Sequence, residues 1–305
     1  MNGLMGTVSA PFHAPAAGSC LRNCSDVPDQ AEPSIQLPVK LIMDYRNISF
    51  QIRSGVAILT LNRPHSLNSF NGEMHAEVRN ALQRVTADRV IRCLLLTGAG
   101  RGFCAGQDLN DRAVTANGEP PNLGESLEHN YNPLVRTITE LKKPVVCAVN
   151  GIAAGAGANI ALACDIVLAG RSASFVQGFT KIGLVPDSGG SWTLPRLVGR
   201  ARAMGLALLN HRISAEQALQ WGLIWQLVED DRLQEEAMAI AQHLATQPTL
   251  GLGLTKRAIN AAGGNSLEAQ LQLELELQTL AGRSHDYREG VAAFLEKRTP
   301  SFRGE

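Results

Sequence analysis

The sequence predicts an α/β fold followed by a helical C-terminal part. Between residues 49 and 169, apolar segments with a strand pattern alternate with segments that have helical spacing. This alternation favours mostly parallel strands covered by helices. After about residue 200 the strand signals stop, and five successive segments have helical patterns. At 305 residues the chain is long enough for one large domain with an appendage, or for two domains.

The first half of the chain contains the strand signals. Residues 50 to 61 predict a β-hairpin, because two apolar-rich segments flank the turn Ser54-Gly55. Apolar residues recur with helical spacing over residues 70 to 87. The elements expected after that helix are a strand at Cys93 to Thr97, a helix at 126 to 141, a strand at Pro144 to Val149, a helix at 153 to 163 and a strand at Asp165 to Ala169.

The second half predicts helices. Ser214-Ala-Glu-Gln217 is a capping box, which marks the start of one of them. The expected helices span residues 200 to 209, 214 to 221, 231 to 246, 252 to 262 and 265 to 282. We therefore divide the chain into an α/β core at 43 to 245 and a helical segment at 246 to 305 that we expect to pack on a neighbouring subunit.

Charge and composition favour a small-molecule partner. Lys plus Arg and Asp plus Glu number 28 each, and no basic stripe is present, which argues against a dedicated nucleic-acid or membrane-surface binder. The apolar runs are too short to cross a bilayer.

The cysteines predict a reducing compartment, the cytoplasm. Six cysteines are spread through the chain without a CxxC pair, so we expect free thiols. Residues 1 to 42 lack the features of a secretory signal and are rich in Pro, Ala, Ser, Asn and Gly, so we expect a disordered or non-native extension there. A transit peptide is the alternative, although Arg22 is the single basic residue before Lys40.

A glycine-rich loop follows the strand at Cys93 to Thr97. It reads Gly98-Ala-Gly-Arg-Gly-Phe-Cys-Ala-Gly-Gln-Asp-Leu109, and its glycines allow the backbone to approach a ligand closely. A dinucleotide-binding loop is excluded, because the glycine spacing is wrong and no helix with a later acidic residue follows. An ordinary tight loop remains the alternative.

A second segment, Asn150-Gly-Ile-Ala-Ala-Gly-Ala-Gly-Ala-Asn159, leaves a strand and enters a helix of small residues. A helix N-terminus offers unpaired N–H donors and the positive end of the helix dipole, which suits an oxygen that becomes negative. Close packing of the helix through its small residues is the alternative, and both can hold together.

Together with Lys181-Ile-Gly-Leu-Val-Pro-Asp-Ser-Gly-Gly190, these two segments resemble the crotonase superfamily, also called the enoyl-CoA hydratase/isomerase family. The resemblance covers nearly all of residues 44 to 300. It implies a crotonase-like spiral of ββα units, a C-terminal helical trimerisation segment, a homotrimer or a dimer of trimers, and acyl-CoA thioesters as substrates.

The resemblance also implies where the thioester binds. In the family, two backbone N–H groups hold the thioester oxygen, and the matching residues are Ala105 and Ala156. Converging N–H donors stabilise the enolate formed when a proton leaves the carbon beside the thioester. For Arg63 a role near the coenzyme phosphates or a solvated turn are both open. The resemblance places the pantetheine and adenine path along Ala105, Gly106, Gln107 and Asp108.

The chain departs from the pattern of the family's hydratases. The two glutamates that position water in those enzymes correspond to Asn159 and Phe179, and neither exchanges a proton at neutral pH. Asp187 stands where isomerases of the family carry an acidic catalytic residue. One carboxylate can remove a proton and return it elsewhere, so the resemblance implies an isomerase. Further segments, among them Tyr131-Asn-Pro-Leu-Val135, are similar to isomerases acting on an aromatic ring-epoxide thioester and on 3-enoyl-CoAs.

An aspartate with an ordinary pKa of ~3.9 is a weak base for a carbon acid. We expect apolar neighbours, Phe179, Leu184, Val185 and Trp192, to raise the pKa of Asp187 by desolvation. The alternative is that Asp187 caps the helix beginning near Ser191. Asp108 and Asp165 are further acidic candidates, the latter expected to be a turn residue.

Two rival functions remain open. One is a hydratase or another acyl-CoA enzyme, such as a thioesterase, and the other is a non-catalytic acyl-CoA-binding or RNA-binding relative. We expect no cofactor beyond the coenzyme A of the substrate. We also expect no metal site, because the histidines lack ligand spacing.

Overall fold

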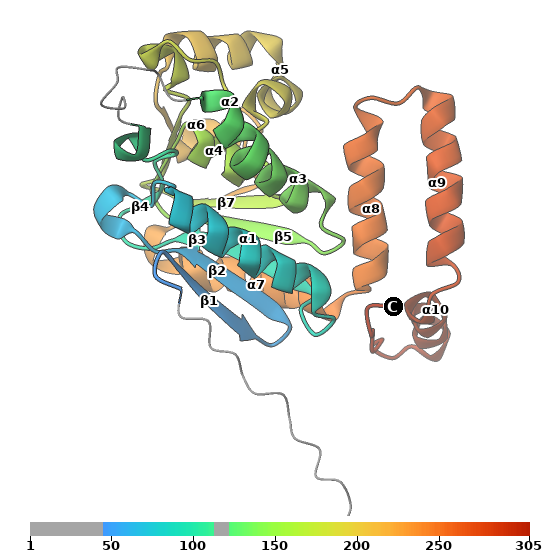
Figure 1. Cartoon of the computed structure of the whole chain (residues 1–305). Coiled ribbons are helices and arrows are strands. Elements are labelled where there is room, and N and C mark those ends of the chain that lie inside the picture. The colour runs from blue at the N-terminus through green and yellow to red at the C-terminus, as the bar shows by residue number, and fades with distance from the viewer. Residues whose placement is uncertain (1–44, 113–121) are drawn as a thin grey trace, which may run out of the picture. The chain divides into compact units, whose positions relative to one another are not determined.

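The computed structural model describes residues 45–112 and 122–305, whose main feature is a six-stranded sheet (Figure 1). The strand order is β1-β2-β3-β5-β7-β10, and all neighbours are parallel except the β1-β2 hairpin. Both residues of the hairpin turn, Ser54 and Gly55, have positive φ, as a tight two-residue turn requires. The strands are β1 (Ile48–Arg53), β2 (Val56–Leu61), β3 (Cys93–Gly98), β5 (Val145–Val149), β7 (Ile166–Gly170) and β10 (Gln226–Val228).

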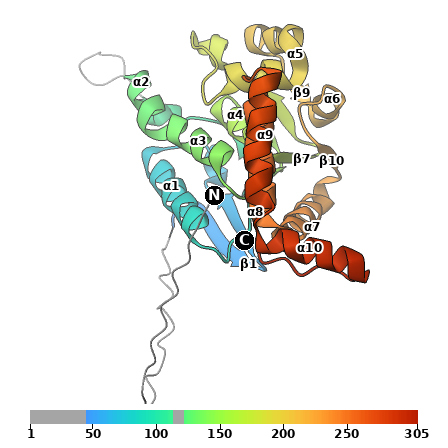
Figure 2. The ribbon, with the colours of Figure 1, turned by 90° about the vertical axis from the view of Figure 1, so that its right-hand side faces the viewer.

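Helices cover both faces of this sheet, which explains why its central strands are apolar throughout. Alternate residues of β3, such as Leu94 and Leu96, pack in the cluster that includes α1 (Gly72–Ala87) and α3 (Asn132–Glu140). Cys93 and Leu95 point to the opposite face, where α7 (Leu233–Thr246) packs. Figure 1 shows α1 and α3 in front of the sheet with α7 behind it, and Figure 2 shows the same layers from the side.

A second, four-stranded sheet carries the two glycine-rich segments. Its order is β4-β6-β8-β9, and β4, β6 and β8 each follow one of the large-sheet strands β3, β5 and β7 along the chain. This repetition gives the ββα spiral expected from the family, because the short helix α4 (Ala156–Leu162) follows β6. The strands are β4 (Gly102–Cys104), β6 (Ile152–Ala154), β8 (Ser174–Val176) and β9 (Ile213–Ser214).

Helices dominate the part of the chain after β8. A 3-10 turn, η4 (Phe179–Ile182), leads to the long helix α5, which is kinked at Gly199. Besides α7, the helices of this part are α5 (Gly190–Leu209), α6 (Ala215–Gln220), α8 (Thr249–Ala262), α9 (Leu267–Ala281) and α10 (His285–Glu296). Short helical segments elsewhere are η1 (Pro64–Ser66), η2 (Leu109–Arg112), α2 (Leu123–Ser126), η3 (Leu127–Tyr131) and η5 (Asp230–Arg232).

One arginine ties the end of the chain to the start of β3. The Arg92 guanidinium donates to Thr249 Oγ1 at 2.9 Å, to Gln247 O at 2.5 Å and to Phe302 O at 2.9 Å. The tail also bonds to α10, because Asp286 accepts from the backbone N–H groups of residues 303 and 304. The last residues are therefore held by hydrogen bonds to charged side chains.

The structure corrects several predicted elements. The helix expected at 153 to 163 begins only at Ala156, because residues 152 to 154 form β6. Strands do not stop at residue 200, since β9 and β10 follow. The helix expected at 200 to 209 begins at Gly190, and α10 was not expected.

Some predictions concern residues outside the described part of the chain. Cys20, Cys24 and the extension at 1 to 42 lie there. The four cysteines that are described, Cys93, Cys104, Cys147 and Cys164, are buried and unpaired, as expected. Among the described helices, none is both long and apolar enough to span a membrane.

Candidate active site

The two glycine-rich segments meet at the start of α4. Gly106 has a φ of +88°, and a Cβ added there would lie 3.3 Å from Ala156 N and 3.7 Å from Gly157 N. A Cβ added at Gly157 would in turn lie 2.7 Å from Cys104 Sγ. Glycine at both positions therefore permits a close approach of two backbones that are far apart in sequence.

Ala156 is the first residue of α4, and every residue of this helix is buried. Gly155 precedes it with a φ of +53° and donates its N–H to Val176 O at 2.9 Å. The N–H groups of a helix's first turn have no partner within the helix. The role of the Ala156 N–H as an oxyanion donor stays a prediction. The structure places this N–H at the N-terminus of a buried helix.

The structure contradicts the assignment of Ala105 as the second donor. Ala105 N donates to Leu67 O at 2.9 Å, so its hydrogen is directed at another protein carbonyl. Two residues later, Gln107 forms a parallel bridge with Phe70, in which Phe70 N donates to Gly106 O and Asp108 N donates to Phe70 O. In such a bridge the N–H of the central residue, Gln107, points away from Phe70.

Asp187 lies between η4 and α5 and is half-buried. Its Oδ1 accepts from Ser188 Oγ at 2.9 Å, and its backbone oxygen accepts from Gly190 N at 2.8 Å. The N-cap residue of α5 is Gly189. The structure therefore does not place Asp187 at the helix cap, which was the alternative interpretation of this segment.

The structure places both residues that the resemblance matches to the hydratase glutamates at α4. Asn159 is buried in α4 and donates from Nδ2 to Asp187 O at 2.8 Å. The buried ring of Phe179 faces the start of α4, since a Cβ added at Gly155 would lie 3.7 Å from its Cζ. The structure thus places Asn159 against Asp187 and Phe179 against the residue before Ala156, while their roles in catalysis stay predictions.

Arg63 and Asp108 form an ion pair with little exposure to water. Arg63 Nη2 donates to Asp108 Oδ2 at 2.9 Å, and Nη1 donates to Ser69 O at 2.6 Å. Their side chains are only 13% and 8% exposed, so Arg63 is not a solvated turn residue. Burial raises the pKa of Asp108, but hydrogen bonds from Arg63 and Asn110 outweigh it and hold that pKa below its usual range.

The side chain of Gln107 points into the protein. Its Oε1 accepts from the hydroxyl of the fully buried Tyr131 at 2.9 Å. The Tyr131 ring in turn packs edge-on against His75, with 4.5 Å between the ring centroids. Gln107 therefore joins the glycine-rich loop to α1 and to the residues before α3.

The predicted apolar wall around Asp187 is only partly present. Leu184 is half-buried and donates its N–H to Phe179 O at 3.0 Å. Val185 is 77% exposed, so it does not form a wall within this chain. The Trp192 ring stacks with Arg196, whose guanidinium carbon is 3.9 Å from the ring centroid, and lines a groove beside α8.

Asp165 is not a simple turn residue. Its Oδ2 accepts from Val145 N at 2.7 Å and from Lys256 Nζ at 2.9 Å, which ties β5 and α8 together. Burial raises the pKa of Asp165 although Lys256 acts in the opposite direction. Its partners therefore indicate a structural role.

Gln177, a buried side chain that reaches Asn159, was missed because an isolated Gln in Val-Gln-Gly has no sequence signal.

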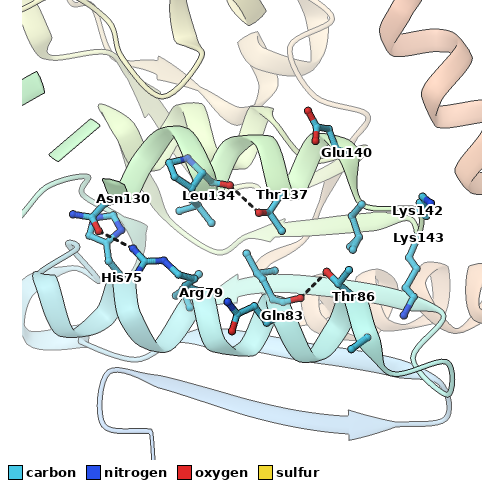
Figure 3. A pocket seen from close by; sticks show the side chains of 15 residues that line it. His75, Arg79, Gln83, Thr86, Asn130, Leu134, Thr137, Glu140, Lys142 and Lys143 are labelled. Atoms are coloured by element: carbon cyan, nitrogen blue, oxygen red, sulfur yellow. Dashed lines mark hydrogen bonds between the residues drawn. The ribbon is translucent and has the colours of Figure 1, made fainter. Parts of the chain in front are cut away.

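A groove of about 710 Å³ lies between α1 and α3 (Figure 3). Val78 and Leu82 lie on one side and Leu134 on the other, with Arg79 and Asn130 hydrogen-bonded across one end. None of the predicted site residues lines it.

The chain is similar to known proteins over most of its length. The enoyl-CoA hydratase/isomerase family model matches residues 51–305. The chain is 63% identical over 254 residues to the 1,2-epoxyphenylacetyl-CoA isomerase of Escherichia coli K12, covering 83% of this chain and 97% of that protein. It is 37% identical to the 2,3-dehydroadipyl-CoA hydratase of the same organism, covering 82% and 95%. Among solved structures, enoyl-CoA hydratase from Bacillus anthracis matches with a TM-score of 0.79 and 35% identity, covering 85% and 100%. This chain, with its ββα spiral and two converging glycine-rich segments, belongs to the enoyl-CoA hydratase/isomerase family.

Proposed function

We propose that this protein is an acyl-CoA isomerase that converts ring-1,2-epoxyphenylacetyl-CoA to the oxepin thioester and shifts 3-enoyl-CoA double bonds to the 2-position. One observation carries the proposal, namely 63% identity over nearly the whole length of a 1,2-epoxyphenylacetyl-CoA isomerase. The residues of the site agree with it. Asn159 and Phe179 cannot exchange protons at neutral pH, and Asn159 contacts Asp187, whose carboxylate can.

The proposed chemistry uses protein groups alone and needs no cofactor. For the double-bond shift, Asp187 removes a proton from the α-carbon of a 3-enoyl-CoA, and the electrons move onto the thioester oxygen. Backbone N–H groups stabilise that oxyanion, and the proton returns at the γ-carbon. Epoxide and oxepin are likewise isomers, so that reaction neither gains nor loses atoms.

For the oxyanion donors we propose the N–H groups of Ala156 and Gln107. Ala156 begins a buried helix, and Gly106 brings the loop against that helix at van der Waals distance. The parallel bridge with Phe70 directs the Gln107 N–H away from Phe70, whereas the Ala105 N–H is directed at Leu67 O. Gln107 therefore replaces Ala105 in the proposal.

The coenzyme path is proposed along the backbone of residues 105 to 108. Asp108 and Arg63 act there as a pair that fixes the loop, since each charge has the other as partner. Of the roles left open for Arg63, this pairing favours neither the coenzyme phosphates nor a solvated turn, because its guanidinium is bound to Asp108 and Ser69 O.

A hydratase is the second candidate, because several relatives carry that name, including the 2,3-dehydroadipyl-CoA hydratase at 37% identity. Hydration requires an acid and a base that hold water at the double bond. The corresponding positions here are an amide engaged by Asp187 O and a buried phenyl ring. These contacts favour the isomerase.

We further propose that the chain assembles with copies of itself in the cytoplasm. Leu267, Leu271 and Leu275 recur every four residues on α9 and are all exposed. On α10, Phe294 is 83% exposed and Leu295 is 74% exposed. An apolar surface of this kind is costly in water and is typical of a subunit interface. A homotrimer or a dimer of trimers is the form expected from the family resemblance.

The proposed function is tested by incubating the purified protein with a panel of acyl-CoAs in deuterated water, followed by mass spectrometry. The panel contains the ring epoxide, a 3-enoyl-CoA and a 2-enoyl-CoA. We expect the ring epoxide and the 3-enoyl-CoA to give products that are isomers of the substrates. In the 3-enoyl-CoA, the transferred proton either exchanges with solvent deuterium or moves internally. Addition of water to the 2-enoyl-CoA without isomerisation of the others would replace the isomerase by the hydratase.

A further inference from the structure

Two buried amide side chains, those of Gln177 and Asn159, form a series of hydrogen bonds that ends at the backbone oxygen of Asp187. Asn159 on α4 is 1% exposed, and Gln177, directly after β8, is 3% exposed. Gln177 Nε2 donates to Asn159 Oδ1 at 3.1 Å, and Asn159 Nδ2 donates to Asp187 O at 2.8 Å. Three segments are thereby joined through amide hydrogen bonds that do not involve the Asp187 carboxylate.

The direction of these bonds is fixed by their acceptor. Asp187 O can only accept, so the Asn159 atom facing it must be the NH₂ group. Asn159 Oδ1 then faces Gln177 and requires a donor, which sets the orientation of Gln177 as well. Gln177 Oε1 is left buried without a hydrogen-bond partner among the described residues. An unsatisfied buried acceptor costs free energy, so this arrangement is not explained by stability alone.

The segment that Asn159 holds is conformationally demanding. Ser188 and Gly189, which follow Asp187, both have left-handed backbone angles, with φ of +51° and +78°. A non-glycine residue in this region is strained and persists only when its surroundings enforce it. Asn159 supplies part of that enforcement, because its amide also contacts the backbone of Gly190, where an added Cβ would lie 2.6 Å from Asn159 Cγ.

We propose that Asn159 is a positioning residue for Asp187, and that Gln177 holds the Asn159 amide in its working orientation. The inference rests on the proposed function, since it concerns the same carboxylate. It gives a task to the position where the family's hydratases carry a glutamate. In this chain that side chain fixes the proton carrier through its backbone instead of moving a proton itself.

The decisive variant is Asn159→Asp, which keeps the shape of the side chain and its acceptor for Gln177. It removes the donor to Asp187 O and adds a negative charge nearby. We expect kcat to fall on the order of 10- to 100-fold with KM changed less than about 3-fold, as for a misplaced reactive group. The acid limb of the kcat/KM profile should move upward by about one pH unit, because a like charge raises the pKa of a carboxyl.

The surroundings of Asp187 make that pH shift readable. Neither α4 nor β8 contains a titratable residue, and the first turn of α5 contains none. Among the described residues, the charged side chains on the other neighbouring elements are Lys181 on η4, and Arg136 and Glu140 on α3. All three are unchanged in the variant, so a shifted limb reports the new carboxylate.

A matched control is Asn210→Asp, another buried amide, which ends α5 and donates to Thr180 Oγ1 and Leu208 O. It should lower the melting temperature without moving the pH profile. Gln177→Leu is a second test that leaves Asn159 in place, and we expect a fall in kcat on the order of 3- to 10-fold. If Asn159→Asp does not fold, a wild-type kcat in Gln177→Leu overturns the proposal.

A double variant separates this inference from the proposed function. In an Asp187→Asn background, Asn159→Ala should change the residual rate by less than about twofold, because positioning matters only for a working carboxylate. Wild-type turnover by Asp187→Asn alone would overturn the proposed function. An inactive Asp187→Asn combined with wild-type kcat and pH profile in Asn159→Asp would overturn only the positioning role.

Discussion

At the scale of single residues, the identity of two side chains determines what this site can do. Asn159 lies within α4 and Phe179 faces the residue before this helix, and they provide an amide and a phenyl ring at the positions that the resemblance matches to the hydratase glutamates. In the proposed mechanism, Asp187 is left to exchange protons with substrate. The backbone around these residues is formed by glycines and alanines, so changing one carboxylate can alter the chemistry without altering the fold.

Asp187→Asn should therefore separate folding from turnover. The amide has nearly the size of the carboxylate and its Oδ1 can still accept from Ser188 Oγ, but it cannot accept a proton from carbon. We expect at least about a 100-fold fall in kcat for 3-enoyl-CoA isomerisation, with acyl-CoA binding retained. Stopped-flow absorbance measures kcat, and calorimetry measures acyl-CoA binding. The control Asp231→Asn, an exposed carboxylate, should behave as wild type, and equal losses in both variants would contradict a specific role.

The Arg63–Asp108 pair predicts a pH-dependent stability. The pKa of Asp108 is lowered in the folded protein, so its contribution is present above the unfolded pKa of ~3.9 and is lost as pH falls through the folded value. Asp108→Asn should lower the melting temperature at pH 7, and the difference from wild type should shrink below about pH 4. Thermal melts from pH 7 to pH 3 measure it. A difference that stays constant with pH would exclude the ion pair as its cause.

Sequence motifs could predict the candidate residues that lie within the motifs themselves, but not residues whose contacts come from distant parts of the chain. Asp187, Asn159, Phe179 and Ala156 all lie in segments whose order and spacing match the family, and the structure brings them together. Gln177 was not predicted, because its contact with Asn159 depends on how β8 pairs with β6. For Arg63 the solvated turn was wrong, because its buried partner Asp108 is 45 residues away in the sequence.

At the scale of elements, close packing of backbones at α4 positions the site. Gly157 sits in the middle of this approach, because a Cβ there would lie 2.7 Å from Cys104 Sγ and closer still to Cys104 O. Cys104 is fully buried, and burial raises the pKa of its thiol to about 12, so it acts here as an apolar packing group. Any side chain at 157 must move the loop that carries Gln107.

Gly157→Ala should accordingly destabilise the protein and impair the site together. Overpacking of this kind costs about 1–3 kcal/mol, and the displaced loop should lower kcat as well. Gly205→Ala is the matched control, a helical glycine of α5 with nothing within 4 Å of an added Cβ. It should be neutral or stabilise by up to about 1 kcal/mol, since alanine favours helix. Urea unfolding and steady-state rates measure both, and similar effects in the two variants would contradict the packing argument.

Elements with strong local patterns could be predicted, and elements formed by tertiary pairing could not. The hairpin has two six-residue strands and a turn signal, and α7 has fourteen residues with a clear periodicity. Strands β6, β8 and β10 have three residues each and β9 has two, which is too short for any alternation to be visible. Their existence depends on neighbouring strands that come from elsewhere in the chain.

At the scale of the whole molecule, the helices after residue 246 extend the core with a surface suited to another subunit. They are anchored to the core by Lys256, which reaches Asp165 and Ile138 O, and by Asn260, which donates to Thr139 O. Their outward faces nevertheless keep large apolar side chains in water. A monomer would expose these faces permanently, so we expect an assembly in solution.

Replacing Phe294 and Leu295 by glutamate tests this expectation. Both side chains are exposed, so the fold of one chain should survive, whereas charges buried at an interface would oppose assembly. We expect a smaller particle by light scattering coupled to size-exclusion chromatography, with unchanged helicity. Val90→Glu, at an exposed apolar residue before β3, should leave the assembly intact. An unchanged mass in the double variant would place the interface elsewhere.

The hydrogen bonds of Arg92 have a consequence for the order in which the chain is completed during synthesis. Arg92 leaves the ribosome about two hundred residues ahead of Phe302, whose carbonyl it later holds. Gln247 and Thr249 can bind Arg92 earlier, but its Nη1 cannot reach the Phe302 carbonyl until that residue has been made, however well the sheet has formed. A chain that stops before Phe302 would lack this hydrogen bond, so we expect its tail to be held less firmly and to be cleaved sooner by proteases.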